Sequence, residues 1–440
     1  MSELALHLGW ACLGVSLLGA VYALVCGLLV RRHLAGAHEG PSAFPPLTLL
    51  KPLHGDEPGL YGNLQSFCLQ DYPGPIQIVF GVQDFADPAI AVVRALQRRH
   101  PNLAIDLVID AAEHGHNRKV SNLINMSRAV RHEVLVLSDS DIWVEPDYLR
   151  RVVAALSRPG VGFVSCLYTG ADTASLPSIL SAMGISYQFL PNVALGLAAG
   201  MARPCFGSTI ALRRSVLAEI GGFEAFADRL ADDYDLGQAV WSRGYRGAVP
   251  AFAVVHVCRE PTFRELFAHE VRWARTIRAI DPGGFFGCGF THALPWALAG
   301  WALTGFRFYG LAVVAVAVSA RWMLAHEVDG ATGRPAGSGL LLPLRDLLSF
   351  GVFVAAFFAN SVRWSGRRFT VAADGALTST EELSDAAHPV PAGSLLRRLR
   401  RRGGLALPGQ ARDQVLLVPD LAGPARGHGG EQPADRRPAP

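Results

Sequence analysis

A long uncharged apolar run near the start of the chain constrains its fold more than any other feature. Residues 9–30 read GWACLGVSLLGAVYALVCGLLV, which is long enough for a helix to cross the hydrocarbon core of a bilayer. Arg31, Arg32 and His33 follow this run, whereas the basic residues of a cleaved signal peptide precede it. Residues 1–33 are therefore predicted to form a transmembrane anchor, and the positive-inside rule puts the chain after Arg31 in the cytoplasm.

Further apolar stretches in the second half of the chain predict more membrane segments. The globular region and the arginines after the last stretch are both expected inside, so an even number of crossings must separate them. The first stretch is short and contains His292 and Pro295, so it is predicted to lie in the interface or to re-enter. Residues 281–370 are thus expected to form interfacial and transmembrane helices of a multi-pass protein. The stretches are 290–303, 309–324 and 340–360, and the arginines are Arg363, Arg367 and Arg368.

Charged residues in this half of the chain occur within the last apolar stretch and in the segment that follows it. Arg345 and Asp346 interrupt the last apolar stretch and are expected to face protein or an aqueous cleft rather than lipid. Residues 371–440 are rich in Pro, Gly, Ala and Arg, which predicts a disordered basic tail. Because the basic clusters lie beside apolar runs or in this tail, nucleic acid is not a predicted partner.

Between the membrane segments, residues 45–280 are expected to form one globular domain, and from Pro45 to about Tyr168 strand-like runs alternate with segments of helical periodicity. This alternation predicts an α/β domain with a mostly parallel sheet covered by helices on both faces. Ligands of such sheets bind outside the carboxyl ends of the strands. The candidate strands are LTLLKPL, IQIVFGVQD, LAIDLVID, EVLVLSDSD and VGFVSCLY.

Aspartates follow two of these strands. Asp84 ends the second, and Asp139 and Asp141 end the fourth, so all three are expected at the ligand-binding edge. A solvated turn is the simpler interpretation of such residues. However, residues i and i+2 of an extended chain point the same way, so Asp139 and Asp141 can address one cation, and carboxylate oxygens select Mg²⁺ or Mn²⁺. The chain contains no GxGxxG after the first strand and no GxxxxGK[ST], which disfavours dinucleotide and P-loop sites.

A second acidic cluster, DDYD, opens a predicted helix that ends near Gly244. Aspartates at a helix start cap free N–H groups, but one cap uses one aspartate and this segment has Asp232, Asp233 and Asp235. Lys119, at the start of another helix near the same edge, is either a phosphate contact or a solvated lysine. His114 and His116 could be a metal pair, but no other residue supports it.

A third segment, TFRELFAHEVRWARTIRAI, has helical spacing that puts His269, Arg272 and either Thr276 or Arg275 on one face. Two interpretations remain open. The segment is an amphipathic helix in the membrane interface anchored by Trp273, or its guanidinium groups grip a diphosphate.

Together these segments resemble the GT-A glycosyltransferases of the ceramide glucosyltransferase family. The resemblance lies in VQDFADP, the DSD after a strand, the later DDY and the RW helix followed by membrane segments. Other stretches resemble a narrower group within it, the hopanoid-associated glycosyltransferases. These stretches are LLKPLHGDEPGLYGNLQSFCLQDYP, HGHNRKVSNLINM, FGSTIALRR and HEVRWARTIRA.

The resemblance implies a role for each matching residue. Asp84 would contact uridine, Asp139 and Asp141 would hold the metal-bound diphosphate, and Asp233 would be the general base. Arg272 and Trp273 would be the RW of a Q/RxxRW motif, in which His269 takes the place of the usual Gln or Arg. The implied cofactor is Mg²⁺ or Mn²⁺.

The implied reaction is an inverting transfer of a sugar to a lipid, in the bacterial inner membrane with the catalytic domain in the cytosol. The expected donor and acceptor are UDP-N-acetylglucosamine and bacteriohopanetetrol, and the alternative pair is UDP-glucose and ceramide. A processive polysaccharide synthase shares DxD and QxxRW but needs more membrane spans. A non-catalytic sugar-nucleotide-binding or scaffold protein is the remaining alternative.

Overall fold

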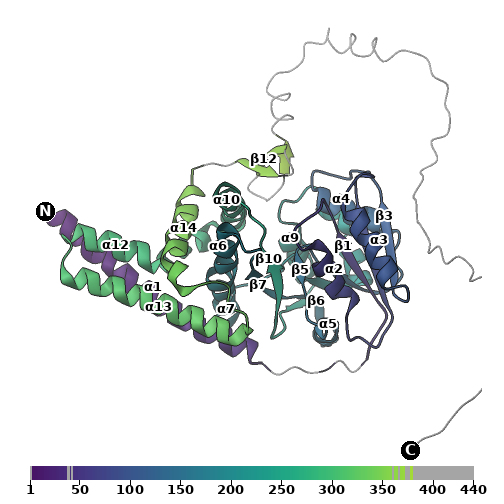
Figure 1. Ribbon diagram of the computed structural model, residues 1–440, viewed down its shortest axis with the longest axis horizontal. Helices are drawn as coiled ribbons and strands as arrows, with labels where there is room; N and C mark the ends of the chain where they lie inside the picture. Colours follow the sequence, from purple (N-terminus) through teal and green to yellow (C-terminus); the bar gives the residue numbers. More distant parts are fainter. Residues whose placement is uncertain are drawn as a thin grey trace, which may run out of the picture.

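The computed structural model describes residues 2–36, 40 and 43–358, together with the backbone of three short strands between residues 361 and 379. Figure 1 shows a helical bundle, a middle layer of helices, and a sheet flanked by helices, in that order. The three late strands, β11 (Ser361–Trp364), β12 (Arg367–Val371) and β13 (Leu377–Ser379), pair in antiparallel fashion. Apart from Val371 and β13, the tail predicted for residues 371–440 lies outside the described residues.

The central sheet has seven strands in the order β3-β2-β1-β4-β8-β6-β9. β1 runs parallel to β2 and β4, β2 to β3, and β6 to β9, so the sheet is mostly parallel as predicted. Only β8 is antiparallel, to both of its neighbours. The strands are β1 (Leu47–Pro52), β2 (Ile76–Val82), β3 (Ala104–Ile109), β4 (Val134–Leu137), β6 (Val161–Ser165), β8 (Ile210–Arg213) and β9 (Arg246–Ala248).

Helices cover both faces of this sheet. Alternate residues of a strand point to opposite faces, and Leu47 and Leu49 join one hydrophobic core with α2, α3 and α5. Leu50 joins a second core with α4, α8 and α9. Because helices cover both faces of the sheet, β1 and β4 are continuous apolar runs rather than runs in which apolar and polar residues alternate. The helices are α2 (Leu60–Cys68), α3 (Ala89–Arg99), α4 (Arg118–Ser127), α5 (Tyr148–Leu156), α8 (Arg214–Glu219) and α9 (Asp232–Ser242).

The run VGFVSCLY, predicted as one strand, is divided between two sheets. Cys166 separates β6 from β7 (Leu167–Ala171), and β7 belongs to a small sheet with β5 (Ile142–Trp143) and β10 (Ala253–Val257). The chain stays extended through the change of sheet, so its residue pattern does not reveal the break. In the small sheet His256 of β10 lies opposite Ile142, the residue after Asp141.

The bundle contains α1 (Glu3–Leu34), α12 (Ala293–Leu303) and α13 (Phe308–Thr332) (Figure 1). Within the described part of the chain, α1 and α13 are the two helices long and apolar enough to cross a membrane. α12 has 11 residues, too few to span, and forms a hairpin with α13 alongside α1. Close packing needs glycine here, because a Cβ on Gly19 would lie 2.9 Å from the carbonyl oxygen of Phe290.

α1 also packs against the rest of the chain beyond the bundle. Ala20, Ala23, Cys26 and Val30 belong to the same hydrophobic core as β1 and β2. The hydroxyl group of Tyr22 donates a hydrogen bond to the side chain of Asn192 in α7 (Leu190–Ala198). The predicted anchor, residues 1–33, is therefore continuous in its packing with the domain expected to begin at residue 45.

A middle layer of helices connects the bundle to the sheet. It contains α6 (Leu176–Gly184), a π-helical turn η1 (Ile185–Phe189), α7, α10 (Phe263–Ile280) and α14 (Leu342–Ala355) (Figure 1). α14 lies in the stretch 340–360, where a membrane crossing was expected, but with 14 residues it is shorter than a spanning helix. Arg345 and Asp346 in α14 are 4% and 7% exposed and face protein, as expected.

Ion pairs join these layers. Arg345 contacts the carboxylate of Glu270 on α10 at 2.5 Å, and the Nε of Arg321 on α13 donates to Asp346 at 3.0 Å. In the loop after α13, the guanidinium group of Arg334 lies 4.7 Å from the centre of the Trp143 ring in β5. The bundle therefore contacts α14 through Arg321 and the segment that follows Asp141 through Arg334, while Arg345 joins α14 to α10 within the middle layer.

Substituting Arg345 by methionine is expected to destabilise the protein by about 3–5 kcal/mol, because the Glu270 carboxylate would stay buried without a partner. The thermal unfolding midpoint in detergent measures this change. The double variant Arg345→Met/Glu270→Met should recover most of the loss. Arg334→Met is the matched control, because its ion pair with Glu145 is half-exposed and worth about 1 kcal/mol or less. Equal midpoints for Arg345→Met and Arg334→Met would contradict this account.

Candidate active site

The carboxyl ends of β1, β2 and β4 meet at one edge of the sheet, because the three strands are parallel neighbours. Asp139 and Asp141 follow β4 at this edge, and Asp84 follows β2. Asp84 is exposed, and its Oδ1 accepts a hydrogen bond from the amide of Ala86 at 2.9 Å. Its role toward uridine stays a prediction.

The segment after β4 is a turn rather than the extended chain expected from the sequence. Ser140 and Asp141 form this turn, so the two carboxylates meet different partners. Asp139 Oδ1 lies 2.6 Å from the Nζ of Lys119 at the start of α4. Asp141 Oδ2 lies 3.3 Å from Nε2 of His256 and 3.2 Å from the guanidinium group of Arg259. Basic groups from two sides of the site therefore hold the turn.

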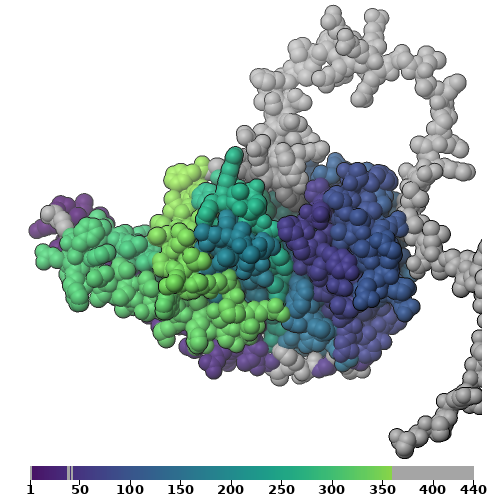
Figure 2. Space-filling model, in the orientation of Figure 1, coloured from purple at the N-terminus to yellow at the C-terminus, as the bar shows by residue number. Residues whose placement is uncertain are grey.

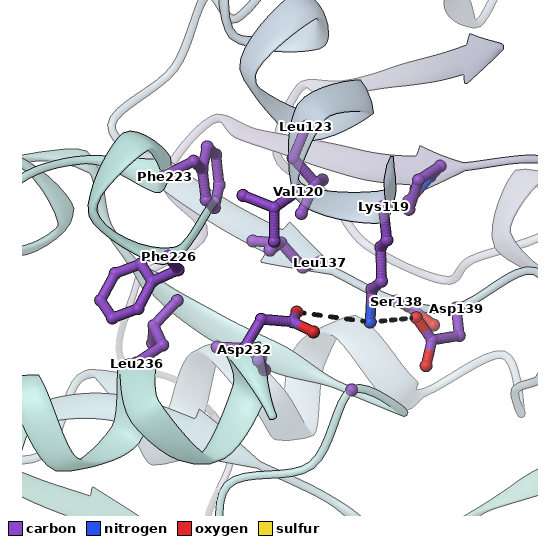
Figure 3. Close-up of a pocket in the computed structure, with 13 residues that line it drawn as sticks. Lys119, Val120, Leu123, Leu137, Ser138, Asp139, Phe223, Phe226, Asp232 and Leu236 are labelled. Atoms are coloured by element: carbon purple, nitrogen blue, oxygen red, sulfur yellow. Dashed lines mark ion pairs between the residues drawn. The ribbon is translucent and has the colours of Figure 1, made fainter. Parts of the chain in front are cut away.

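Lys119 connects this turn to α9 (Figure 3). Its Nζ lies between Asp139 and Asp232, 3.8 Å from Oδ2 of Asp232. Burial alone lowers the pKa of Lys119, but these two carboxylates outweigh that effect and raise it above its usual value. Apolar side chains line the pocket around the ion pairs and limit contact with water: Val120, Leu123, Leu137, Phe223, Phe226 and Leu236.

Asp233, beside Asp232, is held by backbone groups. The amide of Gly207 donates to its Oδ2 at 2.9 Å, and the amide of Tyr234 donates to its Oδ1 at 2.8 Å. Ala231, at the N-cap of α9, has no capping side chain, and Asp233 accepts a hydrogen bond from a free N–H group of the first turn in its place. Burial, followed by the nearby Asp232, raises the pKa of Asp233 to about 6. Such a carboxylate is ionised at neutral pH and basic enough to accept a proton.

The predicted residues of α10 approach the turn through His256. The Trp273 ring lies 6.0 Å from the His256 ring and 4.5 Å from the His269 ring. His269 Nδ1 is 2.5 Å from the carboxylate of Glu260, so this side chain already has a partner. Burial lowers the pKa of Arg272, and no carboxylate of the described chain pairs with its guanidinium group. α10 thus presents a partly buried cation, without a carboxylate partner in the described chain, next to Trp273.

Comparison of the chain with known protein families identifies the family to which it belongs. Residues 12–377 match the profile of glycosyl transferase family 21. The chain belongs to glycosyl transferase family 21. Its sheet and flanking helices form the GT-A glycosyltransferase fold that was predicted.

Curated relatives of this family 21 glycosyltransferase include two ceramide glucosyltransferases of Caenorhabditis elegans. Ceramide glucosyltransferase 1 is 28% identical over 276 residues, 62% of this chain and 58% of the relative. Ceramide glucosyltransferase 3 is 23% identical over 246 residues, 55% of this chain and 52% of the relative. The chain therefore spans little more than half the length of these relatives.

A solved structure with a similar fold is the mannosyltransferase PcManGT from Pyrobaculum calidifontis in complex with GDP-Man and Mn²⁺. It is 23% identical, with a TM-score of 0.45, and the match covers 79% of the family 21 chain and 97% of that chain.

Three basic residues of the family 21 site were not singled out from the sequence: Lys51, His256 and Arg259. Lys51 had a visible signal, because a lysine inside the apolar run LTLLKPL must find a polar partner when the strand is buried. His256 and Arg259 come at and after the end of β10, and only the pairing of β10 with β5 places them beside Asp141.

The two histidines considered as a metal pair have separate partners. His114 Nε2 lies 2.8 Å from the side-chain oxygen of Asn125, and His116 Nδ1 lies 2.7 Å from Asp228. His114 therefore contacts α4 near its C-terminal end, and His116 contacts the segment between α8 and α9.

The turn after β4 has oxygen atoms suited to a divalent cation. Oδ1 of Asp141 is buried and has no hydrogen-bond partner in the described chain. Within the same residues, no group of three His, Cys, Asp or Glu side chains could hold a metal alone. Mg²⁺ is commonly held by one or two carboxylates together with substrate phosphates, and Mn²⁺ takes similar oxygen ligands. Asp139 and Asp141 fit that pattern.

Proposed function

We propose that this family 21 enzyme transfers a sugar from a UDP-sugar to a hydroxyl group of a membrane lipid, inverting the anomeric carbon in one displacement. The observation that carries the proposal is the meeting of Asp139, Asp141 and Asp233 at an edge that α10 and α14 connect to the membrane bundle. The donor would bind at the carboxylates, and the acceptor would reach them from the bilayer. The names of the ceramide glucosyltransferase relatives support a lipid acceptor.

Each side chain then has a chemical task. A bound divalent cation would neutralise charge that grows on the leaving UDP. Asp139 and Asp141 would hold it, and Arg272 would add a second positive charge at the diphosphate. Asp233 would accept the proton of the acceptor hydroxyl as its oxygen attacks the sugar.

The other predicted residues are assigned to the donor. Asp84 would contact uridine, and Lys119 would contact the diphosphate. Because His269 is already engaged by Glu260, we assign it to the orientation of Trp273 rather than to the leaving group.

Different observations support two donor and acceptor pairs. The curated relatives are named for transfer of glucose to ceramide, which supports UDP-glucose and ceramide. The stretches HGHNRKVSNLINM and HEVRWARTIRA resemble hopanoid-associated glycosyltransferases, which supports UDP-N-acetylglucosamine and bacteriohopanetetrol. The relatives favour the ceramide pair, which reverses the order expected from the sequence. A bacterial inner-membrane location with a cytosolic catalytic domain stays part of the proposal.

A product assay on the full chain in detergent tests the proposal. Each of the two donors is combined with each of the two lipids in the presence of Mg²⁺ or Mn²⁺, and mass spectrometry identifies the product. We expect one pairing to yield a lipid that carries a single sugar. A lipid with many sugars would instead indicate a processive synthase, and no product from any pairing would refute sugar transfer to these lipids.

Removal of divalent cations with EDTA is expected to lower the rate about a hundredfold or more, since metal neutralisation of a leaving diphosphate contributes several kcal/mol. Adding back Mg²⁺ or Mn²⁺ should restore the rate. A rate that EDTA leaves unchanged would remove the metal from the proposal while leaving sugar transfer in place.

A further inference from the structure

Lys51 lies beneath the turn that carries Asp139 and Asp141. Lys51 is 0% exposed and lies near the end of β1, in a sheet that helices cover on both faces. Its Nζ donates to the backbone carbonyl of Asp139 at 2.6 Å and to the hydroxyl of Ser138 at 3.3 Å. The Phe67 ring centre lies 3.7 Å from the same nitrogen.

The partners of this ammonium group are unusual for a buried charge. A buried charge normally pairs with an opposite charge, because its loss of hydration is costly. In the described chain no carboxylate oxygen lies within ion-pair distance of Lys51, and its short contact is to a neutral carbonyl. Methionine would fill the same space at a lower desolvation cost. Packing therefore does not account for a lysine here, and its role lies in the hydrogen bonds that the amine donates.

The carbonyl that Lys51 holds belongs to the residue that turns the chain. The amide of Asp139 donates to the carbonyl oxygen of Gly207 at 3.3 Å, while its own carbonyl accepts from Lys51. Both peptide groups around Asp139 are thereby fixed. Its side chain remains free to point toward Lys119, and Ser140 begins the turn to Asp141.

We propose that Lys51 is a positioning residue for the donor site: by holding the Asp139 carbonyl, it sets the direction of the Asp139 and Asp141 carboxylates that receive the metal and the diphosphate. The inference rests on the proposed function, because it assigns those carboxylates to the metal–diphosphate group. It gives Lys51 an effect on donor binding and no direct contact with substrate.

The test compares stability with metal binding in three variants of the full chain. Lys51→Met removes the charge and the donor, and Lys51→Gln keeps a neutral donor. The matched control Thr48→Val changes another buried polar side chain of β1, which bonds to Gln77 away from the turn. Thermal unfolding reports stability, and the electron paramagnetic resonance signal of free Mn²⁺ reports its binding in the presence of UDP.

We expect opposite effects on the two measurements. Lys51→Met should keep or raise the unfolding midpoint and weaken Mn²⁺–UDP binding about tenfold or more, the usual effect of losing a hydrogen bond to a charged group. Lys51→Gln should bind with intermediate affinity, and Thr48→Val should bind like the wild type.

Two results would overturn the inference while sparing the proposed function. One is Mn²⁺–UDP binding by Lys51→Met equal to that of the wild type. The other is a loss of both stability and Mn²⁺–UDP affinity in Lys51→Met that is equally large in Lys51→Gln. A purely structural lysine would behave in this way. A wild-type chain that binds neither Mn²⁺ nor UDP would refute the proposed donor site itself, and this inference with it.

Discussion

Replacing Asp233 by asparagine is expected to lower the rate of sugar transfer about a hundredfold to ten-thousandfold, the usual contribution of a general base. Asparagine keeps the size of the side chain and can still accept the hydrogen bond from the Gly207 amide, but it cannot take up the acceptor proton. The KM for the UDP-sugar should change little. Asp235→Asn on the same helix is the matched control, because Asp235 faces Arg229 at 3.8 Å. A variant Asp233→Asn with most of the wild-type rate would exclude Asp233 as the base.

The pH profile checks the same assignment independently. Because the pKa of Asp233 is raised to about 6, its basic form is present above that pH and is lost as the pH falls through it. The kcat/KM of the wild type should therefore be level above this pH and fall about tenfold per pH unit below it. The residual activity of Asp233→Asn should lack this acidic limb. A wild-type profile that stays level well below the pKa would contradict the assignment.

Deleting residues 2–33 is expected to prevent folding of the catalytic part rather than to release it as a soluble domain. The deletion removes Ala20, Ala23, Cys26 and Val30 from a core that they share with β1 and β2, and it removes the Tyr22 partner of Asn192. Apolar surface of α7 and of the α12–α13 hairpin would then face solvent. Size-exclusion chromatography in detergent should find aggregated protein without a cooperative unfolding transition.

Two substitutions to leucine in α1, one at a buried and one at an exposed position, separate packing from membrane anchoring. Ala23 is 1% exposed and Val21 is 59% exposed. Ala23→Leu should cost about 1–3 kcal/mol by overpacking, whereas Val21→Leu should leave the unfolding midpoint unchanged. A monodisperse deletion variant with the wild-type midpoint, or equal behaviour of the two substitutions, would show that α1 is only an anchor.

Local patterns in the sequence were enough to predict the edge of the sheet where the site lies. The apolar runs of β1, β2 and β4 identify buried strands, and parallel strands put their carboxyl ends together. Asp139 and Asp141 follow closely after β4, and Asp233 lies in the first turn of α9 as its acidic segment indicates. Each of these predictions uses only residues that are neighbours in the chain.

Partners that are distant in the chain were not predictable in this way. Lys51 and Asp139 are 88 positions apart, and Arg259 and Asp141 are 118 apart. The strand order determines which basic residue lies next to each aspartate. That order includes the antiparallel β8 and the small second sheet. The turn at Ser140 follows from those contacts as well, so the extended geometry assumed for the DxD segment was wrong. Similarly, an apolar run predicts the length of α1 but not the core that it joins.

The contact between Arg334 and Trp143 constrains how the sequence of such a protein can evolve. Arg334 follows the α12–α13 hairpin, and Trp143 lies in β5, two positions after Asp141. A recombination event that replaced only the hairpin and the loop after it would bring in a new residue at position 334 without the residue that it contacts at position 143. Chimeras that exchange the hairpin between family 21 members should therefore work best when the residue at position 143 is exchanged with it. The α12–α13 hairpin and the turn after β4 would thus be inherited together, although more than 100 residues separate them in the chain.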